Sequence, residues 1–306
     1  MNQSSRASVP MVGLTADGPS LSAIVAGVWR IGSWQLDRPA RARWIEDRVA
    51  LGVTSFDLAD IYGDYGAEAL FGEALATLSG LRERIQLVSK CGIKLVSERR
   101  PAHAINSYDT SRAHVLASVD ASLRALRTDR LDLLLVHRPD YLMDPDALAA
   151  TFDELRAAGK VLHFGVSNHS ASQLALLGRR VPLATNQIEL SPLHLEPLDD
   201  GTLDQCVDLG MRPMIWSPLG GGRLFTGTDD RSRRVQSVLA AIAGAHGVSA
   251  ATIAYAWLLR HPSRAVPIVG SRRLVALQEA IGALEVALTS EEWYRVWEAG
   301  AGHPVP

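Results

Sequence analysis

Short apolar runs recur along the chain and are separated by segments with helical periodicity. Several of these runs are almost continuously apolar, which is typical of parallel strands that are buried on both faces. The predicted strands are residues 22–28, 52–59, 85–90, 131–137, 161–167, 183–189, 211–217 and 265–271.

The segments between the runs carry the start and stop signals of helices. Segment 39–52 has Pro39 in its first turn and Gly52 after its last turn. Segments 67–78 and 111–126 place their apolar residues on one stripe. A further helix is predicted over 249–262, because serine is a common N-terminal cap and proline stops a helix.

A last helix is predicted near the C-terminus. Thr289 and Glu292 form a T-x-x-E capping box, and Trp293, Val296 and Trp297 then fall on one face. We expect this extra helix to lie against the wall of the domain.

Strands that alternate with helices indicate βαβ units and a parallel sheet. Eight such strands in one chain predict a closed (β/α)8 TIM barrel, with an N-terminal segment at the barrel bottom. The alternative is an open doubly wound sheet, but its G-x-G-x-x-G spacing is absent from the sequence. We predict a disordered tail over residues 1–9 and a single barrel domain over 10–306.

Composition excludes several classes of protein. The formal charge of −2 gives no basic field for nucleic acid. The two cysteines, Cys91 and Cys206, support neither a disulfide framework nor a zinc-type metal cluster. No signal peptide or membrane span is evident, so we expect a cytoplasmic protein, monomeric by default, whose partner is a small molecule.

Polar side chains stand at the ends of three predicted strands, where barrel enzymes carry their reactive groups. These are Asp57, Lys90 and His137, and Tyr62 lies in the loop after Asp57. A tyrosine titrates near ~10, and a neighbouring ammonium lowers that pKa by stabilising the phenolate. We therefore predict that Tyr62 is a general acid, with Asp57 anchoring Lys90 and His137 providing a second hydrogen bond.

Each of these residues alone also has a structural explanation. Asp57 fits a turn-capping role, Tyr62 a surface position and His137 a place in the core. The combination at matching strand ends favours the chemical interpretation.

Seven stretches of the sequence resemble the aldo-keto reductase superfamily over about residues 10–300. They are "FDLADIYGDYGAEALFGEAL", "LVSKCG", "LDLLLVHRPD", "GKVLHFGVSN", "TNQIELSPLH", "WSPLGGGRLF" and "PIVGS". The chain is most similar to the short-looped bacterial branch of that superfamily. The resemblance implies reduction of aldehydes and ketones with NADPH and without a metal. It assigns the proton donor to Tyr62, which Lys90 would make more acidic.

The same resemblance implies a cofactor site along the later strand ends. Ser167, Asn168 and Gln187 match the positions that hold the nicotinamide carboxamide, which needs both donors and acceptors. Trp216 matches the aromatic residue on which the nicotinamide stacks.

The resemblance also assigns the phosphate and adenine contacts. The pyrophosphate loop contains Ser217, Leu219, Gly222 and Arg223, where glycine permits close backbone approach and arginine supplies charge. The group at the 2′-phosphate and adenine end comprises Gly270, Ser271, Arg272 and Glu279, with assistance from Arg273.

Two positions depart from the family pattern. Alanine stands at Ala276 and Ala280, where relatives often carry polar side chains. The preference for NADPH therefore rests on Arg272 and Arg273, and NADH is an alternative cofactor.

The substrate pocket is expected to draw on Trp29, Trp34, Tyr65 and the loop 91–109. These residues suit many aldehydes and ketones equally.

Two other functions fit part of the pattern. A barrel aldolase would use Lys90 to form a Schiff base, although a lysine paired with Asp57 is a poor nucleophile. A regulatory or sensor protein would hold NADPH with little turnover, although all four catalytic residue types are present.

Overall fold

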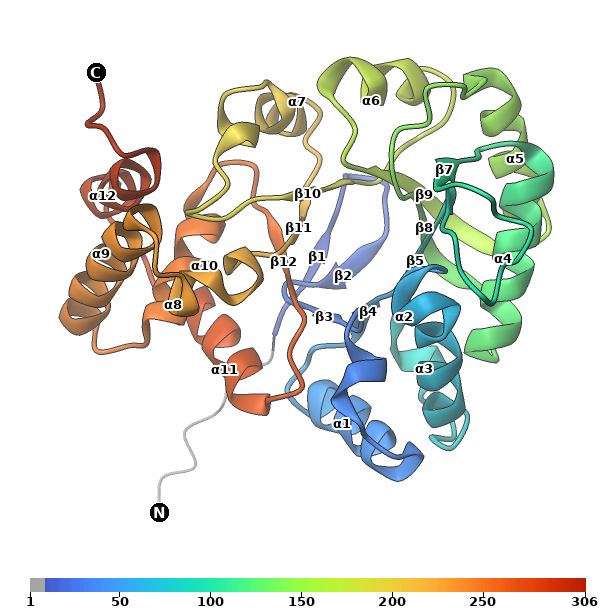
Figure 1. Ribbon diagram of the computed structural model, residues 1–306, viewed down its shortest axis with the longest axis horizontal. Coiled ribbons are helices and arrows are strands. Elements are labelled where there is room, and N and C mark those ends of the chain that lie inside the picture. The colour runs from blue at the N-terminus through green and yellow to red at the C-terminus, as the bar shows by residue number, and fades with distance from the viewer. Residues whose placement is uncertain (1–8) are drawn as a thin grey trace.

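Eight parallel strands close into a barrel in the computed structural model, which describes residues 9–306 (Figure 1). The order around the barrel is β10-β11-β12-β3-β4-β5-β8-β9. Its strands are β3 (Val25–Gly27), β4 (Ser55–Asp57), β5 (Gln86–Cys91), β8 (Leu131–Val136), β9 (Val161–Ser167), β10 (Asn186–Glu189), β11 (Met214–Trp216) and β12 (Val266–Val269). Each predicted run overlaps one of these strands, and the predicted TIM barrel is confirmed.

Helices follow the strands and form an outer layer around the barrel (Figure 1). They are α1 (Arg38–Ala50), α3 (Ala67–Leu75), α4 (Arg112–Leu126), α5 (Pro145–Ala157), α6 (Ala171–Gly178), α7 (Thr202–Asp208), α10 (Ala250–Arg260) and α11 (Leu274–Gly282). The side chains of Asp37, Ser111 and Ser249 cap α1, α4 and α10 by accepting backbone N–H bonds. Local capping chemistry therefore sets these helix starts near the predicted residues.

An antiparallel hairpin of β1 (Met11–Gly13) and β2 (Ser20–Ser22) closes the bottom of the barrel. Leu14 and Leu21 are fully buried in the apolar cluster that fills the barrel interior. The N-terminal segment thus occupies the predicted place. Of the predicted tail, Val9 is buried in the core, and residues 1–8 lie outside the described part of the chain.

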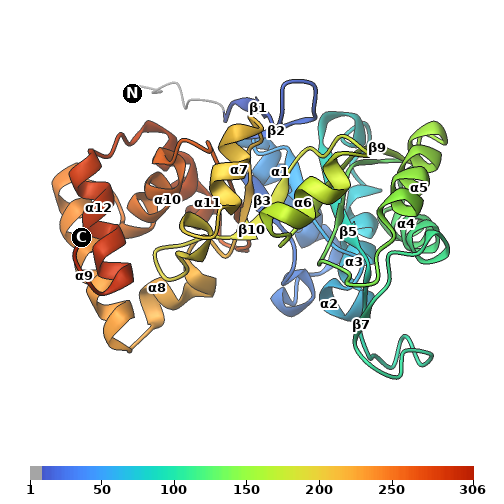
Figure 2. The same cartoon turned by 90° about the horizontal axis from the view of Figure 1, so that it is seen from above.

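The opposite end of the barrel carries α2 (Tyr62–Tyr65) and a second hairpin of β6 (Ile93–Lys94) and β7 (Ser107–Tyr108). Figure 2 shows α2 and β7 on the side of the molecule away from β1 and β2. All the barrel strands run toward this end, so their carboxyl-terminal residues lie here.

The C-terminal helix α12 (Ser290–Ala301) begins at the predicted capping box. It packs on α9 (Asp230–His246) and on α10 of the outer helical layer (Figure 1), so it lies against the wall of the barrel domain, as predicted. Trp293 of α12 stacks on Trp257 of α10 at 5.1 Å between ring centroids. Each indole N–H donates to the other residue's carbonyl oxygen.

Among the described residues, no single helix is long and apolar enough to cross a membrane. The pair α9 and α10 passes the same test of length and composition together, with a bend of 94° between the two helices.

Helix α3, which follows the Tyr62 segment, approaches α4 closely at Gly72. A Cβ atom at this position would collide with the Ala125 carbonyl oxygen and lie 2.7 Å from the Leu126 Cα. Only glycine fits here without moving a helix.

We expect Gly72→Ala to lower the free energy of unfolding by about 1–3 kcal/mol, because an overpacked contact forces backbone shifts. The matched control is Gly244→Ala in α9, where an added Cβ meets no atom within 4 Å in the described part of the chain, apart from the adjacent backbone of α9 itself. Its stability should stay unchanged or rise by up to about 1 kcal/mol through helix propensity. Denaturant unfolding of both variants measures the difference, and equal stabilities would contradict the predicted contact.

Candidate functional site

Lys90, Asp57 and Tyr62 meet at the carboxyl end of the barrel. The Lys90 Nζ lies 2.9 and 2.8 Å from the two Asp57 carboxylate oxygens and 2.7 Å from the Leu58 carbonyl oxygen. It lies 3.1 Å from the Tyr62 hydroxyl. Lys90 is 1% exposed, so the ion pair is closed to bulk water on the lysine side.

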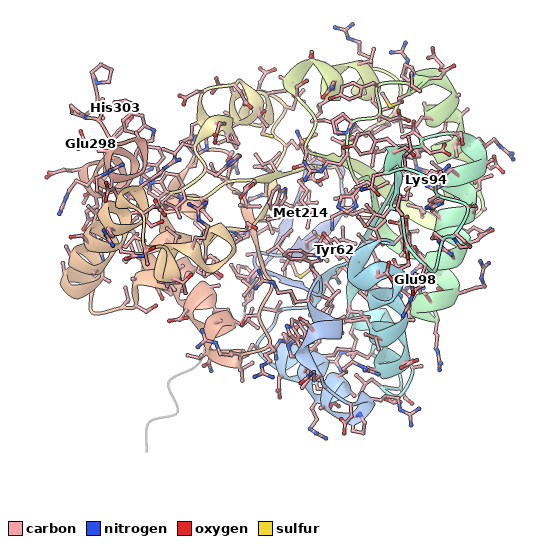
Figure 3. The ribbon with its side chains drawn as sticks, in the orientation of Figure 1. Tyr62, Lys94, Glu98, Met214, Glu298 and His303 are labelled. Atoms are coloured by element: carbon pink, nitrogen blue, oxygen red, sulfur yellow. The ribbon has the colours of Figure 1, made fainter. Side chains whose placement is uncertain are left out.

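His137 completes the group of four predicted catalytic residues. Its ring centroid lies 5.7 Å from that of Tyr62 in an edge-on arrangement. Figure 3 shows Tyr62 near the centre of the ring of strands. The structure thus brings together all four residues that the strand ends singled out.

The charge states follow from burial and from the neighbouring groups. Burial would lower the pKa of Lys90, but the adjacent Asp57 and Tyr62 outweigh it, and the pKa is raised. Burial lowers the pKa of His137 well below its usual value, with further lowering by Lys90 and Arg138. At neutral pH the lysine is therefore an ammonium and the histidine a neutral imidazole.

The pKa of Tyr62 differs from the prediction. Burial raises it above the ordinary value and outweighs the lowering by Lys90. Lys90 acts in the expected direction, yet the net shift is upward because the phenol is deeply enclosed. Tyr62 therefore holds its proton at neutral pH.

The predicted carboxamide and stacking residues form one hydrogen-bonded chain. Gln187 Nε2 donates to Asp57 Oδ1 at 2.7 Å, and the Ser167 hydroxyl donates to the Gln187 carbonyl oxygen at 2.8 Å. Asn168 Nδ2 donates to Ser167 Oγ at 2.7 Å. The Trp216 indole N–H donates to Asn168 Oδ1 at 2.9 Å. The chain links the ion pair on β4 and β5 to the end of β11.

The loop after β11 exposes its backbone. Gly220, Gly221 and Gly222 all have positive φ, of 58°, 66° and 103°, which glycine adopts without strain. Apart from the adjacent residues, no described residue has an atom within 4 Å of a Cβ added at Gly221 or Gly222. The loop thus has an open surface, and it continues into the exposed Arg223, which contacts Asp229 at 3.5 Å. Ser217 and Leu219 lie in this same loop, half-exposed.

The loop after β12 carries the residues assigned to the 2′-phosphate. Arg272 and Arg273 are exposed, and the Arg273 N–H donates to Ser271 Oγ at 3.2 Å. Gly270 is also exposed and has no atom within 4 Å of an added Cβ. This loop therefore presents two cations and an open backbone.

On α11, which follows this loop, Glu279 is half-buried, and Ala276 and Ala280 face the core. The two alanines therefore add no polar side chain to the predicted adenine end of the site.

The residues predicted for the substrate pocket have three different environments. Trp29 is 57% exposed, and its ring lies 6.5 Å from that of Tyr62. Trp34 is 8% exposed and packs on Trp44 at 5.0 Å, so it is a core residue and the pocket-rim prediction is wrong. The Tyr65 hydroxyl accepts the Leu95 N–H at 2.8 Å and holds the β6–β7 hairpin against α2.

Two residues near the site were not identified from the sequence. Arg138 lies beside Tyr62 and His137, and its guanidinium is 5.8 Å from the Trp216 ring centroid. Arg48 of α1 is buried and bonds to the loop after β12. Arg138 could have been identified from the sequence because it directly follows His137. Nothing in the sequence around Arg48, beyond its place in a predicted helix, points to the site.

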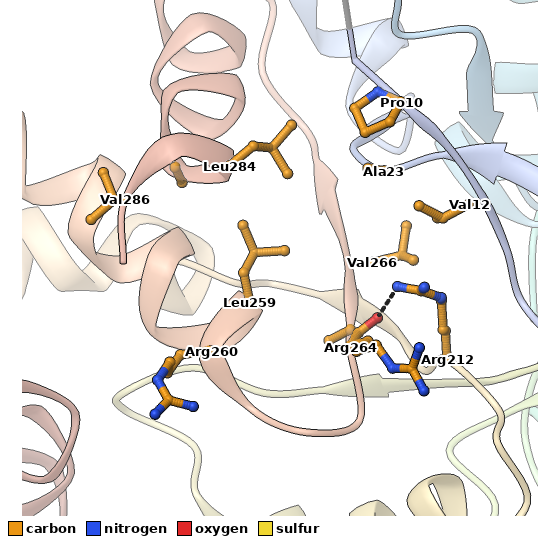
Figure 4. A pocket seen from close by; sticks show the side chains of 12 residues that line it. Pro10, Val12, Ala23, Arg212, Leu259, Arg260, Arg264, Val266, Leu284 and Val286 are labelled. Atoms are coloured by element: carbon orange, nitrogen blue, oxygen red, sulfur yellow. Dashed lines mark hydrogen bonds between the residues drawn. The ribbon is translucent and has the colours of Figure 1, made fainter. Parts of the chain in front are cut away.

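A cavity of about 310 Å³ lies away from this constellation, beside the N-terminal segment (Figure 4). It is lined by Pro10, Val12, Leu259, Leu284 and Arg264, among others. It includes none of the predicted site residues.

Spectrophotometric titration tests the charge state of Tyr62. The difference between the wild type and Tyr62→Phe should show one phenol that ionises above the ordinary tyrosine pKa of about 10, because burial disfavours the phenolate. A midpoint below that value would show that Lys90 dominates over burial.

Comparisons with known proteins agree with the barrel fold. The model of the Aldo/keto reductase family matches residues 23–301. Oxidoreductase YdhF of Escherichia coli is 46% identical over 97% of this chain and 100% of its own length. A 6-dehydroglucose reductase of Agrobacterium fabrum is 41% identical, covering 95% of this chain and 98% of its own.

A solved structure of a thermostable aldo-keto reductase with the inhibitor epalrestat superposes with a TM-score of 0.80. It is 26% identical and covers 95% of this chain and 100% of the other. With the family model and two full-length relatives in agreement, this chain belongs to the aldo/keto reductase family, a family of oxidoreductases.

Proposed function

We propose that this protein reduces aldehyde or ketone carbonyls to alcohols with NADPH, with Tyr62 as the general acid. The observation that carries the proposal is the buried Lys90 ammonium, paired with Asp57 and 3.1 Å from the Tyr62 hydroxyl. A fixed cation beside a protonated phenol stabilises the phenolate that forms when the proton leaves.

The residues present fit a dinucleotide. The open glycine surface at Gly221 and Gly222, next to Arg223, suits a pyrophosphate that is bound by backbone N–H groups and a guanidinium. Trp216 offers a half-exposed indole face for a planar ring. NADPH, when bound, supplies the hydride.

The chain itself supplies two hydrogen-bond donors for the carbonyl oxygen. Tyr62 keeps its proton at neutral pH because burial raises its pKa, so it is ready to give that proton to an oxygen that gains negative charge. His137 is neutral and holds one N–H. Its Nδ1 is buried and has no hydrogen-bond partner among the described residues, whereas Nε2 is not among the buried unpaired atoms, so Nε2 is the nitrogen that we assign to the substrate.

The pairing of Lys90 disfavours the aldolase alternative. A Schiff base requires a free amine, and both Asp57 oxygens hold this lysine as an ammonium with a raised pKa. Borohydride trapping of a substrate on Lys90 without any cofactor would favour the aldolase.

A regulatory or sensor protein would differ from a reductase in its kinetics rather than in the geometry of its site. Lys90 bonds to both Asp57 and the Tyr62 hydroxyl, and the His137 ring lies edge-on to that of Tyr62, an arrangement that a purely binding protein does not require. A single burst of NADPH oxidation with no steady state would favour the sensor.

For the substrate, we propose small or polar carbonyl compounds. The exposed Trp29 and the cationic Arg138 beside Tyr62 suit them, and the 41% identical relative is named for reduction of 6-dehydroglucose. A panel of aldehydes, ketones, quinones and 6-dehydroglucose, followed by loss of NADPH absorbance, identifies the class.

Tyr62→Phe tests the general acid. We expect turnover of a good aldehyde to fall by about 10²–10⁴-fold, because the proton donor is lost while the ring and its packing remain. The Kd of NADPH, measured by quenching of tryptophan fluorescence, should change less than about twofold.

The matched control is Tyr294→Phe on α12, whose side chain is 49% exposed and outside the proposed site. It should leave both turnover and binding unchanged. Substantial turnover in Tyr62→Phe would show that another group provides the proton.

A further inference from the structure

Arg48 joins helix α1 to the loop after β12. Its Nη2 donates to the carbonyl oxygens of Arg272 at 2.9 Å and Ser271 at 3.2 Å. Its Nη1 donates to the Trp44 carbonyl oxygen at 3.2 Å, and its guanidinium lies 4.1 Å from the Trp44 ring centroid. The side chain is therefore fixed on three sides, and Arg48 is 2% exposed.

These bonds set the orientation of two consecutive peptide groups. In a trans peptide the C=O and the following N–H point in opposite directions. Because Arg48 draws the carbonyl oxygens of Ser271 and Arg272 toward α1, the N–H groups of Arg272 and Arg273 face away from the helix. The Arg272 N–H therefore faces away from α1, the Arg273 N–H bonds to Ser271 Oγ within the loop, and the side chains of Arg272 and Arg273 are exposed.

Arg48 is also a buried cation without an acidic partner. Within the described part of the chain, no carboxylate oxygen lies within 4 Å of its guanidinium. Burial, partly offset by Asp47, lowers its pKa to about 10, so it remains charged at neutral pH. Three guanidiniums at one loop leave positive charge that a bound dianion compensates.

We propose that Arg48 is a positioning residue for the 2′-phosphate of NADPH: it holds residues 270–273 in the shape that binds this phosphate and adds to the charge that attracts it. The inference rests on the proposed function, because it assigns this loop to that cofactor. It makes a residue on the first helix of the barrel a determinant of cofactor preference.

Binding of NADPH and NADH to Arg48→Met tests the role directly. We expect the Kd of NADPH to rise about tenfold and that of NADH less than about twofold, since only NADPH carries the 2′-phosphate. Tryptophan fluorescence quenching measures both constants, and calorimetry with 2′,5′-ADP and 5′-AMP repeats the comparison without the nicotinamide. Arg272→Ala should shift the same ratio in the same direction.

Two further variants separate positioning from general stability. Arg48→Lys keeps the charge and one donor, so about threefold weakening of NADPH binding is expected, between the wild type and the methionine variant. Arg82→Lys is the control, because Arg82 also bonds to backbone carbonyl oxygens, those of Ile85 and Arg130, away from the cofactor loop. It should leave the ratio of the two dissociation constants unchanged.

The outcomes distinguish the two proposals. A wild type that binds neither dinucleotide and reduces no carbonyl overturns the proposed function. A wild type that binds NADPH, with Arg48 variants that weaken both dinucleotides equally or neither, overturns only the role of Arg48. A selective loss of NADPH and 2′,5′-ADP binding supports it.

Discussion

The buried ion pair between Lys90 and Asp57 is the constraint on which the rest of the site depends. Moving two charges out of water costs several kcal/mol per ion, and their attraction repays this only with good geometry and further hydrogen bonds. Here both carboxylate oxygens and the Leu58 carbonyl oxygen accept from the ammonium, and Gln187 donates to Asp57 as well. The strand ends thus replace the water around the pair, and three strands, β4, β5 and β10, have to keep their places for it to persist.

Strand register decides whether this arrangement exists at all. Side chains alternate between the two faces of a strand, so Val88 and Lys90 point into the barrel while Ser89 and Cys91 point toward the helices. The parallel pairing sets Asp57 opposite Val88 and Lys90 opposite Leu135. A slip by one residue would turn Lys90 into the helical layer and leave Asp57 without a counter-ion. The placement of Lys90 and Asp57 therefore depends on the apolar interior of the barrel, because its packing fixes the register of the strands.

A strained turn directly follows Tyr62, whose hydroxyl lies beside the Lys90 ammonium. Gly63, Asp64 and Tyr65 follow it with φ of 58°, 54° and 60°, and such values cost roughly 1–2 kcal/mol for each residue other than glycine. The bond from the Leu95 N–H to the Tyr65 hydroxyl ties this turn to the β6–β7 hairpin. Strain that neighbouring contacts hold in place is often found at functional sites, and here it directly follows the proposed acid.

Features that depend on residues close together in the chain could be predicted from the sequence, whereas features that depend on residues far apart in the chain could not. Runs of apolar residues and caps such as Ser249 and Thr289 act locally, so the strands and helix starts were predictable, and the polar strand ends with the loop after Asp57 identified the four central residues. Arg48 bonds to a residue 223 positions away, and no local pattern reveals that. Trp34 was placed at the rim because aromatic residues suit pockets, yet packing on Trp44 buries it. The pKa of Tyr62 needed the full depth of burial, which only the assembled barrel defines.

The pKa shifts of Lys90 and His137 have opposite directions, and they decide which groups at the centre of the site are charged. Lys90 is raised and His137 lowered in pKa, so at neutral pH the centre holds one ammonium, one carboxylate and two neutral donors. The charges of Lys90 and Asp57 cancel in their ion pair, so positive charge near the centre comes from the neighbouring Arg138. In the proposed function, a multiply charged cofactor is then attracted by arginines outside the ion pair, which are Arg138 and those in the loops after β11 and β12. On this proposal, binding and proton transfer depend on separate groups, so substitutions at the arginine loops and at Tyr62 should act through different kinetic constants.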